Sequence, residues 1–335
     1  MIKSIYTGIR SILPTPGRIV LSKIVFSLGI KPKFVDAVHT HFQKGVVCIS
    51  ADFELAWAWQ FSKLKVDPIE MGRRERNHFP IILKKMNELE IPITWATVGH
   101  LFLDSCKKEN GRAHNQVPRP AYFENEIWEY IKGDWYDFDP CSDFKRNPEF
   151  YAPDLIEQIL KSSVKHEIGS HSFSHCDFSN RNSTPELIAA ELEECKKAMA
   201  RFGIKPVSFV FPRNQFGNFN LLAQHGFKVI RYKTNDLKEL GYPETLGNGL
   251  IALHDSVAFD VDETGWDFNF VNYKLRKYVD KAIEKKAICH FWFHPSIPKD
   301  QMEGFFFPIL EYIASKRNRG ELEILTMKQI GDRVG

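Results

Sequence analysis

The 335-residue sequence lacks three features that would each assign it to a class of proteins. It has no apolar run near the ~20 residues that a membrane-spanning helix needs. Its net charge is only +3, so its charge gives no indication that it binds nucleic acid. Its six cysteines include no Cys-x-x-Cys pair, which indicates reduced core residues of a cytoplasmic protein rather than a disulfide framework. Cys176 is the exception, because it directly follows His175 and is either a metal ligand or a loop residue.

The first 44 residues form a separate basic extension. Residues 1–35 carry six Lys or Arg and no acid, with apolar residues between them and interruptions at Pro14 and Pro16. No uninterrupted apolar region with a cleavage site indicates a secretory signal. Two interpretations remain open: peripheral contact with an anionic membrane, or an extension packed on the domain.

The rest of the chain, 45–335, alternates strands and helices as one domain. Apolar runs predict strands, and residues at helical spacing predict helices. A parallel sheet, open or closed into a barrel, accounts for this alternation. The stretch 104–150 breaks the pattern and is expected to be an insertion. The expected strands are 45–52, 92–99, 166–171, 207–212, 228–232, 250–254, 287–294 and 322–325, and the expected helices are 76–89, 153–162, 184–202, 221–225, 272–285 and 305–315.

Polar residues follow several of the expected strands. Asp52, His171, Arg213 and His294 stand at strand ends, where catalytic residues of parallel α/β proteins gather. His171 and His175 are four residues apart, and neutral imidazole is the commonest transition-metal ligand. Asp52 and Glu54 share one face of an extended chain, so one could ligate a metal while the other accepts a proton. A strand-end pair that only caps a helix is the alternative.

Five segments in the same order, the first of them SADFELAW, resemble the polysaccharide deacetylase family, also called carbohydrate esterase family 4 or the NodB-homology domain. EIGSHSFSH resembles the family's second motif, H-[ST]-x-x-H, and residues 46–331 follow the family's order of elements. The other matching segments are FPIILKKMNELEIPITWATVG, LEECKKAMARFGIKPVSFVFPRNQFG and CHFWFHPS. The resemblance implies a deformed TIM-like (β/α) barrel of about seven parallel strands and metal-dependent hydrolysis of an acetamido group, usually on a glycan.

The resemblance also implies roles for the first two motifs. The family's first motif ends in two aspartates, a general base and a metal ligand. Asp52 takes the first position, Phe53 stands at the second, and Glu54 follows, so Glu54 is expected to be the third ligand beside His171 and His175. The opposite division, with Asp52 on the metal, stays open. Zn²⁺ is the expected ion, with other divalent transition metals as alternatives.

The later motifs depart further from the family. The third is usually R-P-P-Y-G, whereas FPRNQFG places Phe211 at the arginine's position and Arg213 two residues later. Strand alternation predicts that Arg213 pairs with Asp52, and a surface salt bridge is the alternative. His254 and His294 compete for the general acid, and the surrounding elements favour His294. Besides Asn214 and His254, the expected substrate contacts are Phe53, Trp135 and Trp266, with Trp266-Asp267 the nearest match to the fourth motif.

The expected reaction is therefore removal of an acetyl group from an acetamido sugar or glycan in surface-polysaccharide metabolism. The aromatic part of the insertion, Trp128 to Phe138, would either stack on sugar rings or form the core of a long loop. Two other functions stay open: an amidohydrolase similar to allantoinase that acts on a cyclic imide or ureide, and a glycan-binding protein with degraded catalysis. The expected location is the cytoplasm, with or without membrane contact.

Overall fold

A computed structural model describes residues 12–28, 42–232, 240–259 and 267–335. Its centre is a curled sheet in the order β10-β11-β9-β8-β7-β2-β1-β13-β12, with β14 also paired to β1. Every strand pair of this sheet is parallel except β10 with β11. The longer strands are β1 (Gly45–Phe53), β2 (Thr94–Thr97), β7 (Glu167–Ser170), β8 (Ser208–Val210), β9 (Val229–Tyr232), β11 (Ile251–His254), β13 (Ile288–Phe293) and β14 (Leu322–Ile324). The short ones are β10 (Glu244–Thr245) and β12 (Val257–Ala258). This arrangement confirms the expected deformed barrel.

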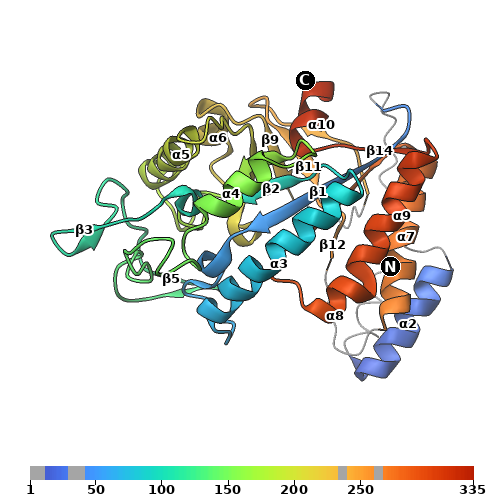
Figure 1. Cartoon of the computed structure of the whole chain (residues 1–335), viewed down its shortest axis with the longest axis horizontal. Helices are drawn as coiled ribbons and strands as arrows, with labels where there is room; N and C mark the ends of the chain where they lie inside the picture. The colour runs from blue at the N-terminus through green and yellow to red at the C-terminus, as the bar shows by residue number, and fades with distance from the viewer. Residues whose placement is uncertain (1–11, 29–41, 233–239, 260–266) are drawn as a thin grey trace.

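Helices surround the sheet, as Figure 1 shows. The expected helices are all present: α3 (Pro68–Glu88), α4 (Pro153–Leu160), α5 (Pro185–Ala200), α6 (Phe219–Gln224), α7 (Phe268–Lys285) and α9 (Phe307–Asn318). Two more, α8 (Lys299–Gln301) and α10 (Met327–Val334), lie near the C-terminus. At α5 the expected start is confirmed, because the Thr184 hydroxyl accepts a hydrogen bond from the Leu187 amide and Pro185 takes the first position.

The start of α3 was predicted too late. The helix begins at Pro68, where the Asp67 side chain accepts a hydrogen bond from the Ile69 amide, rather than at Arg76. Residues 70–76 carry few apolar side chains, so hydrophobic periodicity does not detect this first part of the helix. The extra turns matter because they bring Glu75 beneath the backbone that follows β1.

The register of the parallel strands places their carboxyl ends at one edge of the sheet. Asp52 of β1 lies opposite Ala96 of β2, and Ser170 of β7 lies opposite Thr97. Ala51 lies opposite Phe293, the last residue of β13. The residues that follow these strands are therefore neighbours, although the chain separates them widely.

The insertion has little regular structure. It contains two small hairpins, β3 (Lys108–Glu109) with β4 (Arg112–Ala113), and β5 (Phe123–Glu124) with β6 (Glu129–Tyr130). Its large aromatic side chains pack against neighbouring rings and are at most 2% exposed: Trp128, Tyr130, Trp135 and Tyr136. These rings form the core of a long loop, so the prediction that they stack on sugar faces is wrong for these four.

The described part of the N-terminal extension forms a helix, α2 (Thr15–Ser27), on the side of the molecule opposite hairpins β3 and β5 (Figure 1). Lys23 of α2 pairs with Asp267, whose side chain caps α7, at 2.8 Å. Within the described ranges, no helix has both the length and the apolar character needed to cross a bilayer.

Candidate active site

A cavity of about 180 Å³ opens at the carboxyl edge of the sheet. Side chains that follow β1, β7, β8 and β13 meet there, together with Arg231 from β9. It is lined by Asp52, Glu54, Ala58, Trp59, Ser62, Leu64, Ile127, His175, Arg213, Asn214, Arg231, Trp292 and His294. Of the sequence-predicted residues, the structure therefore brings together both acids, His175, Arg213, Asn214 and His294.

Glu54 lies at the centre of the histidines. Its Oε1 is 2.7 Å from Nε2 of His171 and 3.3 Å from Nε2 of His175, while its Oε2 is 3.8 Å from Nε2 of His294. Glu54 and the first two histidines are almost completely buried, whereas the His294 side chain is 39% exposed at the mouth of the cavity. Glu54 thus faces both a buried histidine pair and an accessible histidine.

The donor atoms of Glu54, His171 and His175 fit a cation. Nδ1 of His171 lies 2.8 Å from the Val210 carbonyl, which can only accept, so Nδ1 carries a proton and Nε2 is the nitrogen that faces Glu54. Neither ring nitrogen of His175 has a hydrogen-bond partner among the described residues. Two imidazoles and a carboxylate in this buried arrangement are a common donor set for catalytic zinc.

The electrostatic environment keeps these groups in their metal-binding forms. Burial raises the pKa of the Glu54 carboxyl, but the neighbouring His175 and His294 lower it more, and the net pKa lies well below its usual range. Burial lowers the pKa of His175 to about 4, against the opposing effect of Glu54. At neutral pH the site therefore holds a carboxylate and a neutral imidazole, the protonation states that bind metal.

Asp52 pairs with Arg231, not with Arg213 as predicted. Arg231 donates from Nη1 to Oδ1 and from Nη2 to Oδ2 of Asp52, each at 2.6 Å. Arg213 turns the other way and donates to the carbonyls of Ile127, at 2.8 Å, and Ala58. The prediction assumed an extended chain, but Arg213 has φ 49° in a tight turn, which breaks the alternation of side chains.

The sequence contained one signal for Arg231. It is a charged residue that directly follows the apolar Val229 and Ile230 within the predicted strand 228–232, where a long cation needs a buried partner. Arg231 also donates to the Ser50 hydroxyl at 3.0 Å, and that oxygen lies 3.0 Å from Nε2 of His290. Burial, and then the charge of Arg231, lower the pKa of His290 to about 3, so His290 is a neutral part of the support beneath Asp52.

Two other buried carboxyl groups hold the loops of the site. Glu191 of α5 accepts hydrogen bonds from the amides of Phe173 and Ser174, each at 2.9 Å, and so fixes the loop between the two histidines. Glu75 of α3 accepts from the Glu54 amide at 3.1 Å. Neither residue can be identified from the sequence, because each appears there as an ordinary acid on a helix.

Backbone strain collects around the cavity. Five residues other than glycine adopt left-handed φ values between 49° and 62°, a region that costs free energy for residues with a side chain. They follow β1, β7 and β8, and each turns the chain sharply just after a strand. They are Leu55, Ser172, His175, Arg213 and Asn214.

Several predicted substrate contacts lie elsewhere. Phe53 is completely buried and stacks on Phe79 at 4.9 Å, because alternation along β1 directs it away from Asp52 and into the core. Trp135 is buried in the insertion and donates to the Ser174 hydroxyl. His254 ends β11 near Glu244, outside the residues that line the cavity. Trp266 lies outside the described residues.

The chain is similar to known proteins in sequence pattern and in fold. The polysaccharide deacetylase family matches residues 70–230. Two similar solved structures are a Mycobacterium smegmatis protein assigned to the polysaccharide deacetylases (17% identity, TM-score 0.60, 90% of this chain and 94% of that one) and PuuE allantoinase (13%, 0.57, 89% and 93%). A third is a probable polysaccharide deacetylase from Pseudomonas aeruginosa PAO1 (12%, 0.56, 86% and 90%). At these identities the structural likeness establishes the fold alone. No curated protein sequence matches the chain.

Proposed function

Because the chain belongs to the polysaccharide deacetylase family as a divergent member, we propose that it removes an acetyl group from an acetamido sugar with the help of a divalent metal ion. Membership of this family makes it a hydrolase of acetylated glycans. The observation that carries the metal-dependent proposal is the convergence of Asp52, Glu54, His171, His175 and His294 on one cavity edge.

We assign the metal to Glu54, His171 and His175. Glu54 is favoured over Asp52 as third ligand because its Oε1 contacts Nε2 of both buried histidines. The donor set suits Zn²⁺. When bound there, the ion would polarise the acetyl carbonyl and activate water.

Asp52 is then placed to accept the proton of the attacking water. Arg231 restrains both carboxylate oxygens, so Asp52 faces the cavity in one orientation and loses little entropy when it reacts. Each oxygen keeps a free lone pair, because a carboxylate offers about four acceptor sites. Arg213 carries its charge at the cavity wall and, with Asn214, can contact the substrate.

His294 is placed to protonate the leaving nitrogen. It is the most accessible of the site's histidines, and its ring packs edge-on against Trp292 at 5.5 Å. Donation of its proton to the amine as the C–N bond breaks releases acetate and the free amino sugar. The competing histidine, His254, lies away from the cavity and does not offer this geometry.

The test is acetate release from an N-acetylated chito-oligosaccharide by protein that has been stripped of metal and reconstituted with zinc. We expect release to need the metal and to disappear in Asp52→Asn, while Asp300→Asn, which changes an exposed acid on α8, keeps it. Turnover that survives chelation and Asp52→Asn would refute the proposed mechanism. Hydrolysis of a ureide without acetate release, or glycan binding without turnover, would instead support the two alternative functions.

We also propose that the enzyme acts on surface-polysaccharide precursors in the cytoplasm, with α2 at the membrane. Six unpaired cysteines suit a reducing compartment. Val20, Ile24 and Leu28 of the α2 segment are 57%, 49% and 68% exposed, and their four-residue spacing places them on one face. Co-sedimentation with anionic vesicles should be lost in Val20→Ser/Ile24→Ser. Unchanged sedimentation of this variant, or no sedimentation of the wild-type protein, would refute membrane contact.

A further inference from the structure

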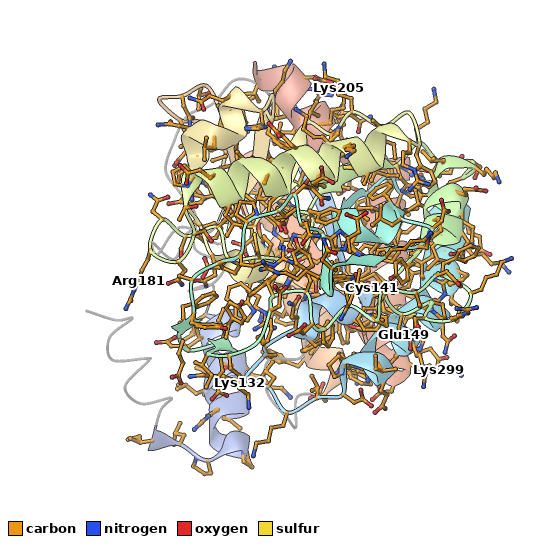
Figure 2. The ribbon with its side chains drawn as sticks, turned by 90° about the vertical axis from the view of Figure 1, so that its left-hand side faces the viewer. Lys132, Cys141, Glu149, Arg181, Lys205 and Lys299 are labelled. Carbon is orange, nitrogen blue, oxygen red and sulfur yellow. The ribbon has the colours of Figure 1, made fainter. Side chains whose placement is uncertain are left out.

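A second group of metal-binding side chains lies outside the active site, where the insertion meets the barrel. It consists of His100, Cys106, His114 and Asp139, whose ligand atoms all lie within 4.8 Å of one another. His100 and Asp139 are completely buried and His114 is 6% exposed. Figure 2 looks onto this face and places the neighbouring Cys141 near its middle.

The four ligand atoms converge on a single point. Oδ2 of Asp139 is 2.9 Å from Nε2 of His100, 3.2 Å from Nε2 of His114 and 2.9 Å from Sγ of Cys106. The two imidazole nitrogens are 3.2 Å apart. Four ligands held about 2.0 to 2.3 Å from a tetrahedral zinc ion stand about 3.3 to 3.8 Å apart. These four distances would lengthen by about 0.1 to 0.6 Å around such an ion.

A backbone contact directs the His100 ring at the other ligands. Nδ1 of His100 lies 3.2 Å from the Phe150 carbonyl, so Nε2 is the nitrogen that faces Asp139 and His114. The ring therefore offers the group one ligand atom in a fixed position.

Neighbouring residues hold the ligands in place by hydrogen bonds, as the partners of metal ligands usually do. Oδ1 of Asp139, the oxygen that faces away, accepts from the Tyr151 hydroxyl and from the Cys141 amide, each at 2.9 Å. Such outer partners fix the ligand's orientation and leave its other oxygen for the metal. A surface cavity of about 310 Å³ reaches Cys106 and His114 and offers a path for the ion.

From this geometry we propose a second, structural zinc site formed by His100, Cys106, His114 and Asp139. His100 follows β2, whereas the other three ligands belong to the insertion, so the ion joins the insertion to the barrel. The strands of the insertion are only two residues long, so they stabilise its fold little. A bound metal ion would add to the stability of the insertion, because metal binding is coupled to folding. Ile127, whose carbonyl accepts from Arg213 and which lines the active-site cavity, belongs to the same insertion.

Cobalt substitution tests this site independently of the active site. In a His171→Ala/His175→Ala background, which removes the catalytic ligands, Co²⁺ should still bind and show a thiolate-to-cobalt charge-transfer band. The band should disappear with Cys106→Ser. It should remain with Cys195→Ser, a control at a buried thiol that is 3.2 Å from the Ser170 hydroxyl.

A second measurement applies if Cys106→Ser does not fold. Tyr151→Phe keeps all four ligands but removes the hydrogen bond to Asp139, and should weaken zinc binding at this site about 10 to 100-fold. Absence of the cobalt band in the alanine background, or its persistence in Cys106→Ser, would overturn the proposal. Four titratable thiols instead of six in the denatured protein after chelation would also overturn it, because Cys106 and Cys141, 2.9 Å apart, would then form a disulfide. Loss of deacetylation with the band intact would refute only the proposed function.

Discussion

Arg231 and Asp52 form a bidentate ion pair at the cavity, in which Nη1 and Nη2 of the guanidinium each lie 2.6 Å from a different carboxylate oxygen. The two side chains are only 2% and 5% exposed, so water solvates neither charge well and each depends on the other for stabilisation. Arg231 is therefore a positioning residue, which acts on the reaction through Asp52. This pair is also a point at which stability and activity can be separated by experiment.

Arg231→Met should lower the free energy of unfolding by about 3 to 5 kcal/mol, because it leaves Asp52 charged and buried without a partner. Chemical denaturation measures this directly. Arg201→Met breaks an exposed pair with Asp104 and should change the same quantity by less than about 1 kcal/mol. Equal effects of the two substitutions would contradict the importance of the buried pair.

Glu54→Gln and Asp52→Asn should separate metal binding from catalysis. Glu54→Gln removes the proposed third ligand and should weaken zinc binding at the active site by at least about 100-fold. Asp52→Asn should abolish acetate release while it changes zinc affinity by less than about tenfold. Calorimetric titration of metal-free protein, with Cys106→Ser present in all samples to remove the second site, distinguishes the two. The reverse pattern would make Asp52 the third ligand.

His294→Gln should lower kcat about 10² to 10⁴-fold without loss of the active-site metal. A substrate whose leaving amine is a weak base, such as an acetylated nitroaniline, needs less protonation and should lose less activity. His254→Gln is the matched control, because His254 lies outside the cavity and should leave kcat unchanged. A larger loss in His254→Gln than in His294→Gln would reverse the assignment of the general acid.

The lowered pKa of His290 leads to a prediction of how the free energy of unfolding depends on pH. Its pKa is lowered to about 3 by burial and by the charge of Arg231, so on acidification the unfolded chain takes up this proton before the folded one does. Stability is then lost as the pH falls from about 6.5 toward about 3, and His290 alone should account for about 2 to 3 kcal/mol between about pH 7 and about pH 4.5. Denaturation of His290→Gln at the two pH values should show a correspondingly smaller loss. An unchanged loss would contradict the lowered pKa.

Much of the fold could be predicted from the sequence because its elements carry local signals. The hydrophobic run of β1 and the capping residues of α5 act within a few residues of chain, and both elements were found where expected. The start of α3 was missed because its first turns are mostly polar and its cap, Asp67, precedes the apolar pattern. The insertion's aromatic residues were interpreted in two ways, since composition alone does not distinguish a core from a binding surface.

The sequence by itself determined that this is a parallel α/β protein with His171, His175 and two nearby acids at strand ends, because strand alternation and motif spacing are local properties. Only the tertiary structure decided which arginine reaches Asp52. Arg213 has a left-handed φ that turns its side chain away, whereas Arg231 comes from β9, which is four places from β1 in the order of the sheet. It also brought His100 and Asp139 together, 39 residues apart, on the two sides of the boundary between barrel and insertion. Contacts between distant segments depend on how whole elements pack, and no local pattern records them.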